Sequence, residues 1–221
     1  MPGAPDPLYV AARGVLLDAI GALSAHLDAL VLVGAQAVYI HAGEADLAVA
    51  PFTTDADLAI DPRHLAPQPL LEVALVRADF RAARGQVGIW EASVNVEGIP
   101  RIVSVDLLVP DSLSGPGRRG ARIPPHAKTA ARKVSGLEAS LVDHDVRTIA
   151  ALDPRDDRRF ELAVAGPSAL LVAKVHKILD RVSVPDRRTD KDALDVLSLI
   201  EDSTDRRAAH TLRQAARERS V

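Results

Sequence analysis

LVLVGAQAVYIHAGEADLAVAPFTTDADLAID, residues 30–61, sets the architecture expected of this chain. The segment opens with a solidly apolar run, which is typical of a strand that is buried on both faces. A glycine ends that run, a helical segment follows, and a loop leads into a second apolar stretch. The predicted elements are a strand over 29–33, a turn at 34, a helix that begins over 37–41, a loop over 44–54 and a strand over 55–60.

The second of these strands begins with two carboxylates, Asp55 and Asp57. Side chains at positions i and i+2 of a strand project from the same face. Two anions held side by side repel each other unless a cation or a shared proton relieves the repulsion. A divalent metal ion is the usual relief, but an Asp-x-Asp pair taken alone is more often a solvated strand edge, so the pattern indicates a site only together with the features below.

A third acid, Asp106, lies within the apolar run VSVDLLV. Burying an unpaired carboxylate is costly, so an acid in such a run is as consistent with a functional role as with a structural one when it is taken alone. Three carboxylates make an all-oxygen site that suits Mg²⁺ or Mn²⁺. The turn Gly34-Ala35, where a helix starts, offers backbone N–H groups to phosphate oxygens. Together these features indicate metal-assisted phosphoryl or nucleotidyl transfer, with Asp106 as a base or a further metal ligand.

The rest of the chain reads as strands first and helices last. We therefore expect the α/β or α+β class, with a mixed sheet flanked by helices and a C-terminal helical part. The turn Glu97-Gly98 predicts a hairpin between two of the strands. Further strands are expected over 86–96, 101–108, 138–141, 146–150 and 160–164. Helices are expected over 8–27, from about 71 to 79, over 168–182 and over 190–200.

Composition narrows the class of protein. Of 221 residues, 48% are hydrophobic and 26% charged, which is ordinary for a globular protein, and the absence of cysteine excludes disulfides and thiolate metal sites. Neither a signal peptide nor a membrane-spanning run is evident, so we expect a cytoplasmic protein without a membrane partner.

Charge is distributed unevenly. The net charge of −3 gives no overall attraction to nucleic acid, but the segment 111–133 is basic after its first residue. A phosphate backbone is one expected partner of this segment and of the basic tail, and a merely solvated surface is the alternative. The basic residues are Arg118, Arg119, Arg122, Lys128, Arg132 and Lys133, with Arg206, Arg207, Arg213, Arg217 and Arg219 in the tail.

The helix predicted over 168–182 carries a row of cations, Lys174, Lys177 and Arg181, on one face. Such a row would suit triphosphate oxygens, and the alternative is again a solvated face. The opposite face is expected to pack on the protein through its apolar side chains, which are Leu171, Val172, Val175, Ile178 and Leu179.

VGAQAVYIHAG, TTDADLAI and SVDLLV together resemble the core of the DNA polymerase β-type nucleotidyltransferase superfamily. The resemblance implies a nucleotidyltransferase-type sheet, a nucleoside triphosphate as substrate and Mg²⁺ or Mn²⁺ bound by Asp55, Asp57 and Asp106. The chain departs from the pattern at Ala35, where glycine or serine is usual, so a hydroxyl contact to phosphate would be lost. The interval from Gly34 to the acidic pair is also longer than in compact members.

The downstream pattern K-x6-R, followed by K-D-x-x-D, is similar to motifs of the AbiEii and MenT-like toxin nucleotidyltransferases. The resemblance implies that Lys174 binds the nucleotide, with Lys177 as the competing choice, and that Asp192 is the downstream catalytic acid. Thr53 matches a hydroxyl residue that is phosphorylated for control in such toxins, with Thr54 adjacent. The nucleotide-binding set expected overall is Gly34, Ala35, Thr54, Lys174, Lys177 and Arg181.

From these features we expect a nucleotidyltransferase core with the metal site over 1–110, a basic loop with added strands over 111–165, and a helical part over 166–221 that completes the nucleotide site. The expected reaction moves a nucleotidyl group to a hydroxyl. The resemblance implies the tRNA 3′ end as acceptor, a role as a toxin and an antitoxin partner. The alternatives are transfer to a protein or a small molecule, and a non-catalytic binding or regulatory module of the same fold.

Overall fold

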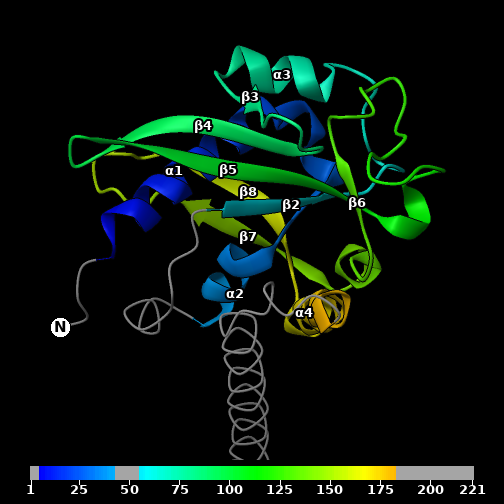
Figure 1. Cartoon of the computed structure of the whole chain (residues 1–221). Coiled ribbons are helices and arrows are strands. Elements are labelled where there is room, and N and C mark those ends of the chain that lie inside the picture. Colours follow the sequence, from blue (N-terminus) through cyan, green and yellow to red (C-terminus); the bar gives the residue numbers. More distant parts are fainter. Residues whose placement is uncertain (1–4, 43–54, 183–221) are drawn as a thin grey trace, which may run out of the picture.

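The computed structural model describes residues 5–42 and 55–182 (Figure 1). Its helices are α1 (Pro7–Ala22), η1 (Ser24–Ala29), α2 (Gly34–Ala42), α3 (Leu71–Arg77), η3 (Asp111–Leu113), η4 (Glu138–Leu141) and α4 (Pro167–Val182), of which those marked η are 3₁₀ helices. Its strands are β1 (Leu30–Val33), β2 (Asp55–Ile60), β3 (Arg81–Ala82), β4 (Ile89–Val96), β5 (Ile99–Pro110), β6 (Arg132–Val134), β7 (His144–Ala150) and β8 (Arg159–Ala165).

The described strands form one mixed sheet in the order β3-β4-β5-β2-β1-β8-β7. Strand β2 runs parallel to β5 and antiparallel to β1, and β1 runs parallel to β8. The short strand β6 pairs in parallel with the last residues of β5, on the edge that β4 leaves after Asp106. The α/β class with a mixed sheet and flanking helices is confirmed.

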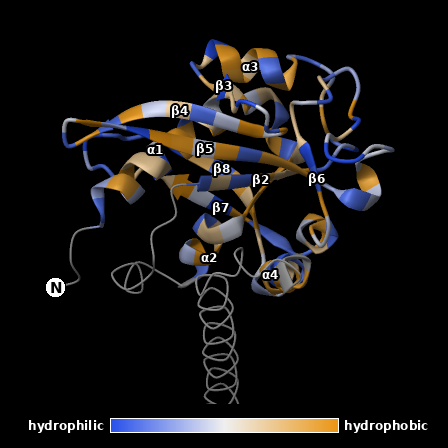
Figure 2. Ribbon diagram, viewed as in Figure 1, coloured by the Kyte–Doolittle hydropathy of each residue, from blue (hydrophilic) through white to orange (hydrophobic). Residues whose placement is uncertain are grey.

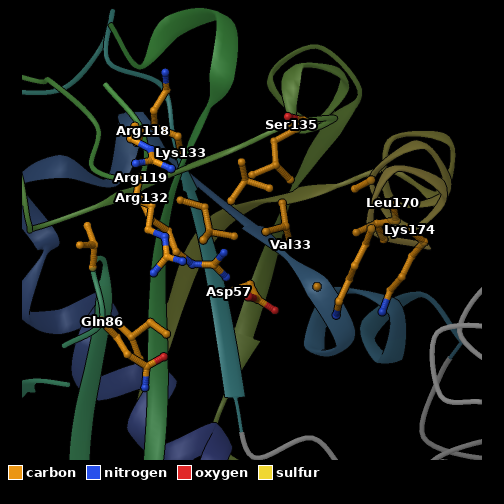
Figure 3. Close-up of a pocket in the computed structure, with 18 of the residues that line it drawn as sticks. Val33, Asp57, Gln86, Arg118, Arg119, Arg132, Lys133, Ser135, Leu170 and Lys174 are labelled. Carbon is orange, nitrogen blue, oxygen red and sulfur yellow. The ribbon is translucent and has the colours of Figure 1, made fainter. Parts of the chain in front are cut away.

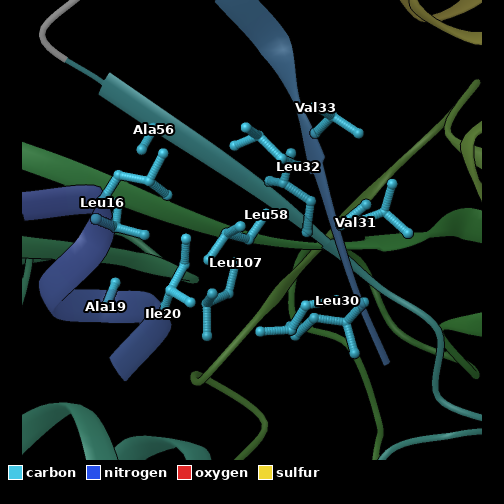
Figure 4. Packing of buried hydrophobic residues seen from close by; sticks show 14 of the residues in the cluster. Leu16, Ala19, Ile20, Leu30, Val31, Leu32, Val33, Ala56, Leu58 and Leu107 are labelled. Atoms are coloured by element: carbon cyan, nitrogen blue, oxygen red, sulfur yellow. The ribbon is translucent and has the colours of Figure 1, made fainter. Parts of the chain in front are cut away.

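Helix α1 packs across one face of this sheet. Its side chains Leu16 and Ile20 lie against Leu58 of β2 and Leu107 of β5 (Figure 4), and all four are fully buried. Strand β5 is hydrophobic along most of its length (Figure 2). Since successive side chains of a strand point to opposite faces, the neighbours of Leu58 and Leu107 project from the face that α1 does not cover.

Buried polar contacts fix α2 against the rest of the fold. Arg13 of α1 donates from Nε to Gln36 Oε1 of α2 at 2.9 Å, and from Nη1 to the carbonyl of Ala150 in β7 at 3.3 Å. At the other end of α2, His41 Nε2 lies 2.8 Å from the carbonyl oxygen of Ala165 in β8. A buried polar group is costly without a partner, so these bonds hold α2 at the end of β1.

Several predicted elements appear where expected. The strand over 55–60 is confirmed, and the predicted hairpin joins β4 to β5 through Glu97 and Gly98, both with positive φ. The helix expected over 8–27 divides instead into α1 and the 3₁₀ turn η1. The helices predicted over 190–200 and in the basic tail fall outside the described residues.

The strand predicted over 138–141 is wrong, because these residues form the 3₁₀ helix η4. The Ser140 side chain donates from Oγ to the carbonyl of Leu137 at 2.6 Å, and its backbone N–H donates to the same oxygen. Local hydrogen bonds of this kind compete with strand pairing, so the segment closes into a turn.

Candidate active site

Two of the predicted acids meet by strand register. In the parallel pair β2–β5, Asp57 lies opposite Asp106, and in the antiparallel pair β1–β2, Asp57 lies opposite Val33. Neighbouring strands lie about 4.8 Å apart, so these two carboxylates share one small area of the sheet face that α1 leaves uncovered. Asp55 is exposed at the first residue of β2, opposite Ser104.

The negative charges of Asp57 and Asp106 favour protonation of the pair or binding of a cation beside it. Burial and the nearby Asp57 carboxylate raise the pKa of Asp106 to about 6, although Arg132 acts in the opposite direction. Desolvation also raises the pKa of Asp57, and Lys177, Arg132 and Lys174 offset this rise only in part. The pair therefore carries excess negative charge that a cation would relieve.

Arg132 supplies such a charge in the structure. Its Nη2 donates to Asp106 Oδ2 at 2.6 Å, and the register pairs Arg132 with Leu108, two residues after Asp106. Leu108 and Asp106 are on one face of β5, so the side chain of Arg132 is on the carboxylate face too.

The junction of β4, β5 and β6 needs a glycine. Gly88 has φ +72°, and a Cβ there would overlap the backbone of Arg132 and of Leu107. The backbone of Gly88 donates to the carbonyl of Thr129 and accepts from Leu107 N–H. Nearby, Trp90 donates from Nε1 to the carbonyl of Ala130 at 2.9 Å. These bonds fix the chain that leads into β6.

A cavity of about 590 Å³ opens above Asp57. Ligand pockets of small molecules and nucleotides fall in this size range. Six basic side chains line it, and Asp57 is the acid among the lining residues. Figure 3 shows Asp57 between two sets of cations, one beside β6 and one on α4. The six are Arg118, Arg119, Arg132, Lys133, Lys174 and Lys177.

The first set is placed by the segment that precedes β6. Lys133 N–H donates to the carbonyl of Arg119 at 2.8 Å, so the arginines lie along the free edge of β6. The Lys133 side chain bonds the carbonyls of Gly115 and Gly117 and pairs with Asp111. Arg118 and Arg119 are exposed at the pocket and form no ion pair within the described part of the chain.

The second set is placed by α4. Asp143 Oδ2 accepts from Ala169 N–H in the first turn of the helix at 2.9 Å, and the Asp143 carbonyl accepts from Gly166 N–H at 2.8 Å. These bonds fix the start of α4, and the pocket-lining residues follow at helical spacing. They are Leu170, Ala173, Lys174 and Lys177.

This placement of α4 corrects the predicted orientation of the helix. The apolar face expected to be buried is exposed instead, with Val175 at 44% and Leu179 at 61%. Lys174 is only 6% exposed, because the face that carries it turns toward the pocket and the sheet. Of the cationic row, Lys174 and Lys177 thus belong to the pocket wall.

Gly34 lines the pocket at the start of α2. It has φ +71°, and a Cβ on this residue would overlap the Asp57 carboxylate. The residue that follows, Ala35, is buried in the core at 6% exposure and does not line the pocket. The glycine is therefore needed for the close approach of the β1–α2 turn to Asp57.

The predicted site residues divide into three groups. Gly34, Asp57, Lys174 and Lys177 meet in the pocket, and Asp106 lies beside it under Arg132. Across residues 5–42 and 55–182, no group of three acids or histidines is close enough to hold a metal ion. Thr53, Thr54, Asp192 and the side chain of Arg181 fall outside what the structure describes.

Sequence reasoning missed that the basic segment before β6 belongs to the same pocket as Asp57. It also missed the pocket residues Gln86 and Ser135, for which the sequence holds no signal. The signal for the basic segment was its cluster of arginines, which predicted a phosphate-binding surface but not where that surface lies.

The site is therefore a carboxylate pair beside a strongly cationic pocket on a mixed α/β sheet, an arrangement whose charge suits a polyanionic ligand. A sequence model described as a nucleotidyltransferase matches residues 12–220. The chain therefore belongs to the nucleotidyltransferase family, whose activity is nucleotidyl transfer, and it is an enzyme. No curated protein and no solved structure matched the chain. Within the described ranges, no helix combines the length and apolarity that crossing a membrane requires.

Proposed function

We propose that the pocket transfers a nucleotidyl group from a nucleoside triphosphate to the 3′-hydroxyl of tRNA, and that the chain acts as the toxin of a toxin–antitoxin pair. The observation that carries the proposal is the placement of Asp57, with Asp106 beside it, at the base of a pocket lined by six cations. The tRNA acceptor and the toxin role rest further on the similarity to AbiEii and MenT-like motifs.

The acids fit a divalent cation by their chemistry. Asp57 and Asp106 offer oxygen ligands from adjacent strands, and their raised pKa values reflect a charge that such an ion would neutralise. Asp55 projects from the same face of β2, but the three acids are not close enough to hold an ion together in this structure, so the proposal requires Asp55 to move toward the pair when the ion binds. Bound Mg²⁺ would neutralise phosphate charge and activate the attacking hydroxyl.

In this proposal the triphosphate binds on the side of the pocket that α4 forms. Lys174 and Lys177 place two positive charges there, and the turn at Gly34 approaches Asp57 closely. Lys174 is buried, and a charge–charge interaction strengthens as water is excluded, so we assign it the main phosphate contact. Lys177 is exposed and takes the secondary contact.

In this proposal the acceptor tRNA binds on the opposite side of the pocket, beside β6. Arg118 and Arg119 are exposed at the pocket, where they suit the phosphodiester groups next to a nucleic-acid 3′ end. In the reaction, the acceptor oxygen bonds to the α-phosphorus, and the bond from that phosphorus to the bridging oxygen breaks. Pyrophosphate leaves, and the hydroxyl proton passes to Asp106 or to water.

The test is incubation of the purified chain with each labelled nucleoside triphosphate, Mg²⁺ and total tRNA. We expect label on tRNA, with a loss of about 100-fold or more in Asp57→Asn, since a metal ion supplies several kcal/mol of charge stabilisation. Asp145→Asn is the matched control, because Asp145 is an exposed acid on β7 away from the pocket.

Periodate oxidation of the tRNA removes the terminal 3′-hydroxyl and should abolish labelling. Transfer to the oxidised tRNA, to protein or to a small molecule would show that the 3′-hydroxyl of tRNA is not the acceptor, and nucleotidyl transfer itself would stand. Absence of transfer to every acceptor, with no metal-dependent triphosphate binding, would favour the non-catalytic module. Growth arrest on expression, absent in Asp57→Asn, tests the toxin role separately.

A further inference from the structure

Arg132 is the pocket cation that forms an ion pair with Asp106. Its Nη2 lies 2.6 Å from Asp106 Oδ2, and Asp106 lies opposite Asp57 in the strand register. Within the described part of the chain, the lining residues Arg118, Arg119 and Lys133 form no ion pair with Asp57 or Asp106. The guanidinium therefore occupies the place where a divalent cation would bind the same oxygens.

The environment of Arg132 allows a second position for its side chain. The backbone is fixed by pairing with β5, but the side chain is 36% exposed and lines the open pocket. Its Nε is buried and has no hydrogen-bond partner in the described part of the chain. The contact with Asp106 thus leaves one donor unsatisfied, and a phosphate in the pocket would offer acceptors to the whole guanidinium.

We propose that Arg132 is a resident counter-cation of the Asp57–Asp106 pair. A divalent metal ion displaces its guanidinium from the carboxylate, and a polyphosphate in the pocket binds the displaced guanidinium. In the ligand-free protein Arg132 neutralises Asp106 and weakens metal binding. Polyphosphate draws the guanidinium away and frees the carboxylate. Metal and polyphosphate binding are therefore coupled through one side chain, and the coupling is reciprocal.

This inference rests on the proposed function only in taking Asp57 and Asp106 as metal ligands. It adds that Arg132 weakens metal binding before the substrate enters the pocket and binds the substrate afterwards. Such an exchange keeps the paired acids neutralised at every stage, since a buried carboxylate left without a cation is costly.

The experiment measures equilibrium Mn²⁺ binding to the full chain, by electron paramagnetic resonance or calorimetry, without nucleotide. We expect Arg132→Gln to bind Mn²⁺ at least about tenfold more tightly than wild type, because the competing charge-assisted hydrogen bond is lost. Arg132→Lys keeps the cation and should stay near wild type. Arg119→Gln removes a pocket cation that does not touch Asp106 and should change Mn²⁺ affinity less than twofold.

The same titration is then made with saturating inorganic tripolyphosphate. With tripolyphosphate bound, Arg132→Gln should bind Mn²⁺ no more tightly than wild type, because the wild-type guanidinium then contacts the anion and no longer competes for Asp106. Chelation of Mn²⁺ by tripolyphosphate is common to both proteins and cancels in their ratio. In the Asp106→Asn background, Arg132→Gln should no longer tighten Mn²⁺ binding.

Unchanged or weaker Mn²⁺ binding by a folded Arg132→Gln protein would overturn the proposal, and so would an advantage that persists with tripolyphosphate. Thermal unfolding shows that each variant is folded before it is compared. These measurements need no turnover, so a failure to label tRNA leaves them interpretable, and their failure leaves the transfer assay intact.

Discussion

Asp106 is one carboxyl group on which three physical effects act together. Burial and the Asp57 charge raise its pKa to about 6, and the ion pair with Arg132 counters only part of this. A carboxyl group in an unfolded chain has a pKa of about 3.9. The folded protein consequently binds more protons than the unfolded chain between these two values.

The stability that protonated Asp106 contributes is fully present below the unfolded pKa and is lost as pH rises through the folded pKa. A shift of about two units corresponds to about 3 kcal/mol. With chelator present, we expect the unfolding free energy of wild type to fall by about this amount, relative to Asp106→Asn, between pH 3 and pH 7. Urea unfolding at several pH values measures it, and parallel profiles of the two proteins would contradict it.

At the scale of elements, hydrogen bonds to an acid distant in sequence fix the start of α4. The Asp143 side chain accepts from Ala169 N–H in the first turn, and its carbonyl accepts from Gly166 N–H just before the helix, although Asp143 precedes Ala169 by 26 residues in the chain. Loss of a capping carboxylate costs about 1 kcal/mol. The same loss frees the start of α4 and moves its lysines.

We therefore expect Asp143→Ala to lower the free energy of unfolding by about 1 kcal/mol and to weaken triphosphate binding several-fold. Urea unfolding and equilibrium dialysis with a labelled triphosphate measure the two effects. Asp145→Ala, two residues further along and exposed, is the control and should change neither. If both variants behave alike, the cap does not position the lysines.

The elements also show what the sequence could predict. β1 and β2 were predictable, because four buried residues before a glycine and a strand that opens with two acids have strong local signals. The register that sets Asp57 against Asp106 was not, since parallel pairing joins strands that are distant in the chain. The existence of α4 was predicted correctly and its orientation wrongly, because apolar periodicity alone favoured burial of Val175 and Leu179.

The short strand β6 had no recognisable pattern, because it has three residues and follows a segment rich in glycine and proline. Missing β6 meant missing Arg132 as the partner of Asp106. The basic segment was consequently separated from the acidic site in the prediction, whereas the two form one pocket.

At the scale of the whole molecule, charge is segregated. The chain has a net charge of −3, yet the pocket collects six basic side chains around one acid. Such a local field attracts anions regardless of the overall charge. The two sides of the pocket can be tested separately, since they come from different parts of the chain.

We expect the double variant Arg118→Gln/Arg119→Gln to raise the KM for tRNA about tenfold and leave the KM for the triphosphate within twofold. Losing two phosphate contacts should also reduce the salt dependence of tRNA binding by about two units of log–log slope. Steady-state kinetics and filter binding at several salt concentrations measure this. Arg122→Gln/Lys128→Gln is the control, because both residues are exposed in the same segment but do not line the pocket.

The hydrogen bond from Trp90 to the carbonyl of Ala130 has a spectroscopic consequence. The chain contains one tryptophan, so its ultraviolet-excited emission comes from a single indole, 4% exposed and attached to the backbone two residues before Arg132. The emission maximum of an indole depends on its hydrogen bonding and its contact with water. The protein thus carries its own optical probe beside β6, and a change of this emission on titration with a ligand would report a rearrangement around Ala130.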